Sequence, residues 1–384
     1  MKSVLIVALI APGGYSAKPI MDAFLNNGFS DVRAFDYQLE RFSIGKDLMQ
    51  TKLIHEANQM KPDLIWMQVQ GSDVLDTETF LTLSKISFTV NFTFDVRINE
   101  QTQWLYNLVP HLGLVCFSNQ EDVDECNRRG HKNCMVLHSS ADPDIYRPDE
   151  TKERKGVVFI GNNFCNTNME FTLSKERVKM VEFLQKEFPN DFTVYGNNWN
   201  GSKLVSQKEE VEIYQSAAVA INHNNFNNES YTSDRLWRIM STGTRCLTKY
   251  FKGIEKIFQV SFNLDSWKDF DELKSKIQYY LPYDEADLSS SLGREFFIKN
   301  HTWTARIKEM MAFIQNNLMD MRDWTFPVFN GCTKAGAHVI DGKIPESLDQ
   351  QLDGRVCDCG KTKWVWTECG CSMKEWQLRM QENI

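Results

Sequence analysis

The stretch Tyr231-Thr-Ser-Asp-Arg-Leu-Trp-Arg-Ile-Met-Ser-Thr-Gly243, followed by Thr244-Arg-Cys-Leu-Thr-Lys-Tyr250, decides how this chain is interpreted. Its apolar residues recur at helical spacing and predict an amphipathic helix that begins near Asp234 and Arg235 and ends at Gly243. The residues after the glycine predict a short buried strand. A helix with an arginine at its N-terminus, leading into a strand through a glycine, is typical of an anion site at the edge of an α/β sheet.

The rest of the chain supplies the setting for this stretch. A length of 384 residues exceeds the usual single core, so two domains are expected. The hydrophobic content of 42% and the charged content of 24% are ordinary for a globular protein. These values set the class of protein and leave its activity open.

The net charge of −8 is unevenly distributed. Residues 1–150 hold 20 Asp and Glu against 13 Lys and Arg, which gives −7, and the remainder holds 31 against 30, which gives −1. A protein that binds nucleic acid through its phosphates usually presents a broad basic face. The sequence shows no such face, although a local basic groove is compatible with these counts.

No apolar run reaches the roughly 18 residues of a membrane-spanning helix. The start, Met1-Lys-Ser-Val-Leu-Ile-Val-Ala-Leu-Ile10, is interpreted as a first strand rather than a signal peptide, because Ala11-Pro-Gly-Gly14 follows too early. Six of the ten cysteines stand singly and four form two close pairs in the tail. This pattern favours a reducing cytoplasm over a disulfide framework, so we expect a cytoplasmic protein.

Residues 1–148 alternate apolar runs with helical segments, which predicts a parallel, doubly wound sheet. The expected strands are Ser3–Ile10, Val32–Tyr37, Leu64–Val69, Phe88–Phe94, Leu112–Phe117 and Cys134–His138. The expected helices include Lys18–Asn27, Leu48–Gln59 and Glu121–Arg129. Ligands of such sheets collect at the carboxyl ends of the strands.

The proline-punctuated segment Ala141–Pro148 predicts an interdomain linker. The alternation then restarts and predicts a second doubly wound domain over residues 149–326. Its expected elements are Gly156–Ile160, Lys175–Glu187, Phe192–Tyr195, Glu209–Ser216, Ala217–Ile221, the opening stretch, Trp267–Leu281 and Trp303–Leu318. Residues 327–384 differ in composition and predict a small cysteine-rich C-terminal module.

Four passages, in this order, resemble the GT-B glycosyltransferases, especially the CgeB-like branch of the group 1 enzymes that is common in bacterial and phage genomes. The resemblance covers about residues 1–320. It rests on the Pro12-Gly-Gly14 loop, on Asp142–Pro148 ("D-x-x-x-F-x-P"), on Asp234–Gly243 ("R-x-x-E-x-x-x-x-G"), and on His301-Thr302 with Arg306 ("H-T-x-x-x-R").

The resemblance implies two Rossmann-like domains that face a cleft and an enzyme that transfers a sugar from a nucleotide-sugar donor, with a UDP-sugar as the default. It places the donor mainly on the second domain and the acceptor on the first. The chain departs from the family at Arg238, where a glutamate usually holds the ribose. Glu229 is a candidate substitute for that contact.

Arg235 is the residue we expect to bind the donor diphosphate, because a guanidinium can hold phosphate oxygens bidentately and stabilise the leaving nucleotide. The alternative is a surface arginine paired with Asp234 or Glu229. Gly13 and Gly14 allow a close approach of the backbone to a ligand, but two glycines equally make an ordinary turn.

Polar residues at strand ends of the second domain are the candidates for holding the nucleotide base and the rest of the donor. They are Gly161, Asn162, Tyr195, Gly196, Asn197 and Asn222, together with Asp234 and Arg238. Stacking on an aromatic ring and hydrogen bonds from amides are usual ways to bind a uracil-type base. The alternative for each asparagine is a local Asx-turn after a strand.

Asp95 follows an aromatic strand of the first domain and is the preferred candidate for a base that accepts the acceptor's proton. Asp73 also follows a strand but is interpreted rather as a helix N-cap. His301 is the rival catalytic or phosphate-contacting residue, with a cap as its alternative role.

The tail contains Cys357-x-Cys359 and Cys369-x-Cys371. Four thiolates suit a closed tetrahedral zinc site that would stabilise a module with little core of its own. The alternative is a tail of cysteines and tryptophans that packs on the second domain.

The leading hypothesis is therefore a nucleotide-sugar-dependent glycosyltransferase. Candidate acceptors are a 5-hydroxymethylpyrimidine in phage DNA, a cell-surface glycan, a protein and a small molecule; a phage-encoded chain would act in the host cytoplasm. Other hypotheses are a non-catalytic nucleotide-sugar-binding protein, favoured by Arg238, and a different enzyme with two Rossmann-like domains, such as a sugar-nucleotide epimerase.

Overall fold

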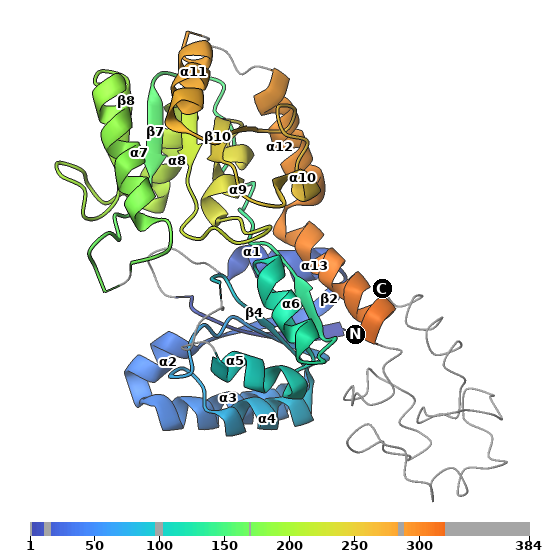
Figure 1. Ribbon diagram of the computed structural model, residues 1–384. Helices are drawn as coiled ribbons and strands as arrows, with labels where there is room; N and C mark the ends of the chain where they lie inside the picture. Colours follow the sequence, from blue (N-terminus) through green and yellow to red (C-terminus); the bar gives the residue numbers. More distant parts are fainter. Residues whose placement is uncertain (1, 11–16, 97–102, 169, 283–287, 319–384) are drawn as a thin grey trace, which may run out of the picture.

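Two parallel β-sheets, each flanked by helices, make up the protein (Figure 1). The structure is a computed structural model and describes residues 2–10, 17–96, 103–168, 170–282 and 288–318. The predicted α/β fold with two Rossmann-like domains is confirmed in these ranges.

The first sheet has six strands in the order β2-β1-β3-β4-β5-β6. Their bounds are β1 Lys2–Ala8, β2 Phe29–Asp36, β3 Leu64–Met67, β4 Phe88–Phe92, β5 Leu114–Phe117 and β6 Cys134–Val136. The helices between them are α1 Lys18–Asn26, α2 Tyr37–Ile44, α3 Lys46–Met60, α4 Thr77–Ile86, α5 Gln103–Leu108, the 3-10 turn η2 Val109–His111 and α6 Gln120–Arg128.

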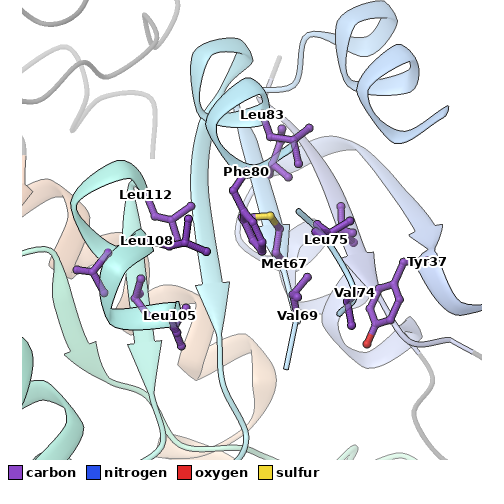
Figure 2. Packing of buried hydrophobic residues seen from close by; sticks show 14 of the residues in the cluster. Tyr37, Met67, Val69, Val74, Leu75, Phe80, Leu83, Leu105, Leu108 and Leu112 are labelled. Carbon is purple, nitrogen blue, oxygen red and sulfur yellow. The ribbon is translucent and has the colours of Figure 1, made fainter. Parts of the chain in front are cut away.

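Apolar layers cover both faces of this sheet, because its central strands are buried on both sides. Strand β3, Leu-Ile-Trp-Met, has no exposed residue. Figure 2 shows one layer, in which Phe80 and Leu83 of α4 approach Met67 of β3. The continuous apolar runs in the sequence are therefore the sheet's interior.

The second sheet has five strands in the order β11-β10-β9-β7-β8. Their bounds are β7 Val157–Ile160, β8 Phe192–Tyr195, β9 Val219–Asn222, β10 Arg245–Lys249 and β11 Asp265–Trp267. The helices are α7 Ser174–Glu187, α8 Gln207–Ser216, α9 Asp234–Ser241, α10 Ile254–Ile257, α11 Phe270–Tyr280, α12 Leu288–Asn300, α13 Trp303–Phe313 and the π-helical turn η3 Ile314–Leu318.

The helix and strand expected from the opening stretch are confirmed as α9 and β10. Leu236 and Ile239 on the buried face of α9 are fully buried. Gly243 ends the helix with a φ of 66°, a left-handed conformation that glycine adopts without strain.

Helix α13 crosses back to the first domain, as Figure 1 shows, although the prediction assigned residues up to 326 to the second domain. Trp303, Ile307 and Met310 belong to the same apolar cluster as Phe24 and Trp66 of the first domain. The chain therefore passes between the domains twice, at the predicted linker and at the start of α13. The predicted module over residues 327–384 lies outside the described residues.

None of the helices that the structure describes is both long enough and apolar enough to cross a bilayer.

Candidate functional site

The site forms where the order of the second sheet reverses. Strand β8 follows β7 on one side of it, and β9 lies on the other side of β7. A crevice opens outside the carboxyl ends of neighbouring strands at such a reversal, and ligands of open α/β sheets bind there. The strand order of this sheet predicts such a crevice between the ends of β7 and β9.

Arg235 bridges these two strand ends. Its Nε donates to the carbonyl oxygen of Ile160, the last residue of β7, at 2.5 Å. Its Nη1 donates to the carbonyl oxygen of His223, directly after β9, at 3.1 Å. Among the described residues, Nη2 of Arg235 donates no hydrogen bond. This nitrogen therefore remains to donate to a ligand.

The start of α9 has no side-chain cap. Ser233 occupies the N-cap position, but its hydroxyl donates to Oδ1 of Asn222 at 3.0 Å instead of accepting from the helix. Among the described residues no acceptor reaches the backbone N–H groups of Asp234 and Arg235. We call these two N–H groups and the Arg235 guanidinium the anion site, because uncapped amides at a helix N-terminus attract negative charge.

Gly161 is required by the position of Arg235. A Cβ atom at residue 161 would lie 3.0 Å from Nη2 of Arg235 and 2.9 Å from the ring of Phe159. Any larger side chain would therefore displace the guanidinium. Gly161 thus leaves room for the guanidinium, and its contact with the donor stays a prediction.

The other strand-end residues fix one another. Oδ1 of Asn162 accepts from the backbone N–H of Asn197 at 2.9 Å. A Cβ atom at Gly196, whose φ is +123°, would lie 2.5 Å from the carbonyl oxygen of Gly161. Tyr195 is half-buried at the end of β8. These residues hold the loops after β7 and β8 together through a contact across 35 residues of sequence rather than a local Asx-turn. Contact with a base stays a prediction.

Asn222 acts within the protein. Its side-chain nitrogen donates to the hydroxyl of Thr248 at 2.9 Å, and the residue is fully buried. Its Oδ1 accepts from Ser233 and, at 3.5 Å, lies at the limit of a hydrogen bond from Arg235. Asn222 therefore helps to hold Ser233 and Arg235 in place at the anion site.

Arg238 is occupied by two carboxylates. Its Nη2 donates to Asp234 at 2.6 Å, and its Nη1 donates to Glu210 at 3.0 Å. The hydroxyl of Tyr146, in the linker, also donates to Glu210, at 2.9 Å. This network joins α8, α9 and the linker beside the cleft. Glu229 is not part of it, because its carboxylate pairs with Lys252 and Lys256.

A cavity lies between the two domains. It is lined by Pro19, Ile20, Gln68 and Phe94 of the first domain, by Ser139 and Ser140 after β6, by Ala141, Asp142, Ile145 and Tyr146 of the linker, and by Gln207, Asp234, Arg238 and Trp303. Asp234, the first residue of α9, therefore faces the first domain.

Asp95, the predicted base, is half-buried beyond the end of β4. Burial raises the pKa of Tyr231 in the second domain, and the negative charges of Asp95 and Asp234 raise it further. Asp95 is therefore within electrostatic range of the segment that leads into α9. Asp73 does not cap a helix; it pairs with Arg41 at 3.0 Å and is 73% exposed.

His301 lies in a buried cluster, and this argues against a catalytic role. Its Nδ1 accepts from Nη2 of Arg306 at 2.7 Å, and its ring stacks on Trp237 at 4.6 Å. Burial, together with the charge of Arg306, lowers the pKa of His301 to about 2. The imidazole is thus a neutral structural acceptor where α12 leads into α13.

The remaining predicted residues lie outside the described residues. They are Gly13, Gly14, Cys357, Cys359, Cys369 and Cys371. Within the described ranges, no group of three or more His, Cys, Asp or Glu side chains is placed to hold a metal ion. The zinc site therefore stays a prediction for the tail.

Sequence reasoning missed Arg177 and Glu210. Arg177 is 1% exposed, and Glu210 is 8% exposed. Both stand within helices among other charged residues, where the pattern indicates only a solvated face. A charged residue at an apolar position of the helical repeat was the available signal for Arg177.

Comparisons with known proteins bear on the family and the fold. Residues 176–312 match a family described as "Glycosyl transferase-like", a range that contains Arg177, Arg235 and Arg306. A search of curated proteins found no match.

Solved structures share the fold. HepE from Anabaena, in complex with UDP and glucose, has a TM-score of 0.55 at 11% identity over 82% of this chain and 100% of HepE. The sucrose-phosphate synthase of Thermosynechococcus elongatus has a TM-score of 0.52 at 10% identity over 82% of this chain and 98% of its own. AviGT4, a glycosyltransferase involved in avilamycin A biosynthesis, has a TM-score of 0.55 at 10% identity, covering 83% and 99%.

At these identities the structures show the fold, which is that of the GT-B glycosyltransferases. The family match adds a sequence pattern in the second domain, where the anion site lies. Together they support the prediction of a nucleotide-sugar-dependent glycosyltransferase.

Proposed function

We propose that the protein transfers a sugar from a UDP-sugar to a hydroxyl acceptor bound against the first domain. The observation that carries the proposal is the anion site: α9 begins with two uncapped N–H groups, and its Arg235 guanidinium is held between the ends of β7 and β9. A diphosphate matches them in charge and in its several acceptor oxygens. Relatives in fold that bind UDP and UDP-glucose support the choice of donor.

The chemistry follows from where charge develops. As the bond between the sugar and the diphosphate breaks, negative charge grows on the leaving phosphate. Donors fixed in advance at that position stabilise the transition state more than the bound donor. Arg235 is fixed by two backbone carbonyls, so little reorganisation is needed when the charge appears.

Asp95 is the proposed base of the first domain. A carboxylate near the acceptor hydroxyl can accept its proton as the sugar is transferred. The charge of Asp95 raises the pKa of Tyr231, which supports a position of Asp95 that faces the second domain. Burial of the reacting groups between the domains would exclude the water that otherwise hydrolyses the donor.

The acceptor is proposed by class only. The cavity between the domains joins carboxylates with apolar side chains such as Ile20 and Phe94, a mixture that suits a sugar ring or a small molecule. The described residues contain no feature that favours hydroxymethylated DNA, and the first 150 residues carry a charge of −7. The narrower resemblance to CgeB-like and phage chains keeps DNA as one arm of the test.

The test is a panel of nucleotide sugars, measured by thermal stabilisation and by release of the free nucleotide. We expect a UDP-sugar to raise the Tm and to be slowly hydrolysed, and Arg235→Ala to abolish both effects. A panel in which no nucleotide sugar raises the Tm would refute the proposal. Stabilisation without hydrolysis or transfer to any glycan, small-molecule or hydroxymethylated DNA acceptor would instead indicate a binding protein.

A further inference from the structure

A second buried guanidinium lies beneath the anion site. Arg177 of α7 is 1% exposed. Its Nη1 donates to the carbonyl oxygen of Asn162 at 3.2 Å, and its Nη2 donates to that of His223 at 2.7 Å. It therefore ties the loop after β7 to the loop after β9.

Arg177 and Arg235 share two partners. Both donate to the carbonyl oxygen of His223, at 2.7 and 3.1 Å. Both guanidinium carbons lie over the ring of Phe159, at 5.6 and 5.3 Å from its centre. The two positive charges are thus held side by side at the crevice.

No carboxylate among the described residues forms a salt bridge with Arg177. The adjacent Glu176 pairs with Lys249 instead. Burial lowers the pKa of Arg177, and the charge of Arg235 lowers it further. The folded protein therefore contains an uncompensated pair of like charges, which is unfavourable unless an anion binds nearby.

The Nε atom of Arg177 is buried and has no partner. A residue kept only for packing would not need a guanidinium at this position. Two like charges beside an uncapped helix N-terminus match an anion whose negative charge is spread over two linked phosphate groups.

We propose that Arg177 is a positioning residue of the anion site: it holds the carbonyl oxygens of Asn162 and His223 and supplies a second positive charge, so that the site selects a diphosphate over a monophosphate. The inference rests on the proposed function, because it identifies the anion as the donor's diphosphate. Arg177 acts through the loops and through its charge, without touching the ligand.

The test compares ligands that differ in charge. Calorimetry at fixed ionic strength measures the affinity for UDP, UMP, uridine, inorganic diphosphate and inorganic phosphate. For Arg177→Met we expect the affinity for UDP and diphosphate to fall about tenfold or more, and that for UMP and phosphate to fall clearly less. Arg177→Lys keeps the charge but cannot bridge both carbonyls, so it should restore part of the difference.

Arg154→Met is the matched control. Arg154 is a half-buried arginine of the same domain that donates to Thr244 and to the carbonyl oxygen of Thr242, near the C-terminal end of α9. We expect its ratio of UDP to UMP affinity to equal that of the wild type. Should Arg177→Met fail to fold, the Lys variant alone still tests the ratio, with a fall of about threefold expected.

The outcomes separate the two claims. A folded Arg177 variant with an unchanged ratio, or with equal losses for UDP, UMP and uridine, would overturn the role of Arg177 and leave the proposed function standing. A wild type that binds diphosphate but not UDP would overturn the proposed function, while the diphosphate-to-phosphate ratio still tests Arg177. A wild type that binds neither would refute both.

Discussion

Arg235 contributes to the anion site as a fixed donor. Its hydrogen bonds to Ile160 and His223 use two of its three guanidinium nitrogens for orientation. A surface arginine would lose side-chain entropy on binding a phosphate, whereas this one has already lost it on folding. The sequence predicted the residue but not its attachment to two strands.

The substitution Gly161→Ala tests this attachment. The added Cβ would lie 2.9 Å from the ring of Phe159 and 3.0 Å from Nη2 of Arg235. We expect the free energy of unfolding to fall by about 1–3 kcal/mol, as for other overpacked sites, and the affinity for UDP to fall as the guanidinium moves. Urea unfolding and calorimetry with UDP measure the two effects.

Gly130→Ala is the control for this substitution. Gly130 has a φ of +88° and open space around its Cβ position, so alanine there adds only backbone strain. Its affinity for UDP should not change. Equal losses of affinity in the two variants would show that Gly161 does not act through Arg235.

At the scale of elements, α9 combines two functions on neighbouring turns. Its first residues present N–H groups to the anion site, and Arg238 ties the helix to α8 and to the linker through Glu210 and Tyr146. The GT-B enzymes that the sequence resembles usually carry a glutamate at this position, whereas Arg238 is a cation bound by both Asp234 and Glu210. Arg238 therefore has a structural partner network of its own.

The substitution Arg238→Glu introduces the residue that the resembling enzymes usually carry and tests the role of this network. It would place a third carboxylate beside Asp234 and Glu210, whose side chains are only 30% and 10% exposed, and remove their shared cation. We expect the free energy of unfolding to fall by about 2–4 kcal/mol, with no gain in affinity for UDP. Chemical denaturation and calorimetry are the measurements.

Arg238→Lys keeps the cation and should lose much less stability. An Arg238→Glu variant that is as stable as the wild type and binds UDP more tightly would contradict the stabilising role of this network. That result would indicate that arginine in place of glutamate at position 238 simply removes the ribose contact.

At the scale of the whole molecule, α13 and the linker join the domains beside the cavity. Ser140, directly before the linker, donates to the carbonyl oxygen of His301, two residues before α13, at 2.5 Å. Loop residue Asn228 of the second domain contacts Glu121 of α6. Both contacts fix how the two sheet edges face each other.

Three buried histidines make the stability of the fold depend on pH. Burial lowers the pKa of His138 and of His223 from 6.5 to about 3, and that of His301 to about 2. The unfolded chain therefore binds more protons below pH 6.5, so the stability present above that pH is lost as the pH falls. Between pH 6.5 and 5.5 we expect a loss of about 1 kcal/mol per histidine.

Urea unfolding at the two pH values checks this expectation. His138→Gln removes one of the three groups and should reduce the loss by about one third, that is about 1 kcal/mol. A free energy of unfolding that is the same at both pH values would show that these imidazoles titrate normally in the folded protein.

Local patterns predicted most of the fold. Continuous apolar runs marked strands buried on both faces, and the spacing of Leu236 and Ile239 marked α9 with its end at Gly243. The return of α13 to the first domain was not predictable, because its apolar face fits either core. Amphipathic spacing indicates that one face of a helix is buried, but it does not identify the core against which that face packs.

The site was predictable in part for a similar reason. Arg235 was found because a helix start and a resemblance coincide there. Arg177 and Glu210 were missed because their roles depend on contacts across 46 and 28 residues of sequence, to His223 and Arg238. The buried surroundings of His301 were not predictable, because sequence shows a histidine before a helix but not the aromatic ring on which it stacks.

A crystal structure of the full chain with UDP tests the central claim most directly. We predict that the diphosphate lies within hydrogen-bonding distance of the N–H groups of Asp234 and Arg235 and of Nη2 of Arg235, at the ends of β7 and β9. A diphosphate bound away from α9, or contacts made only to the first domain, would contradict the account.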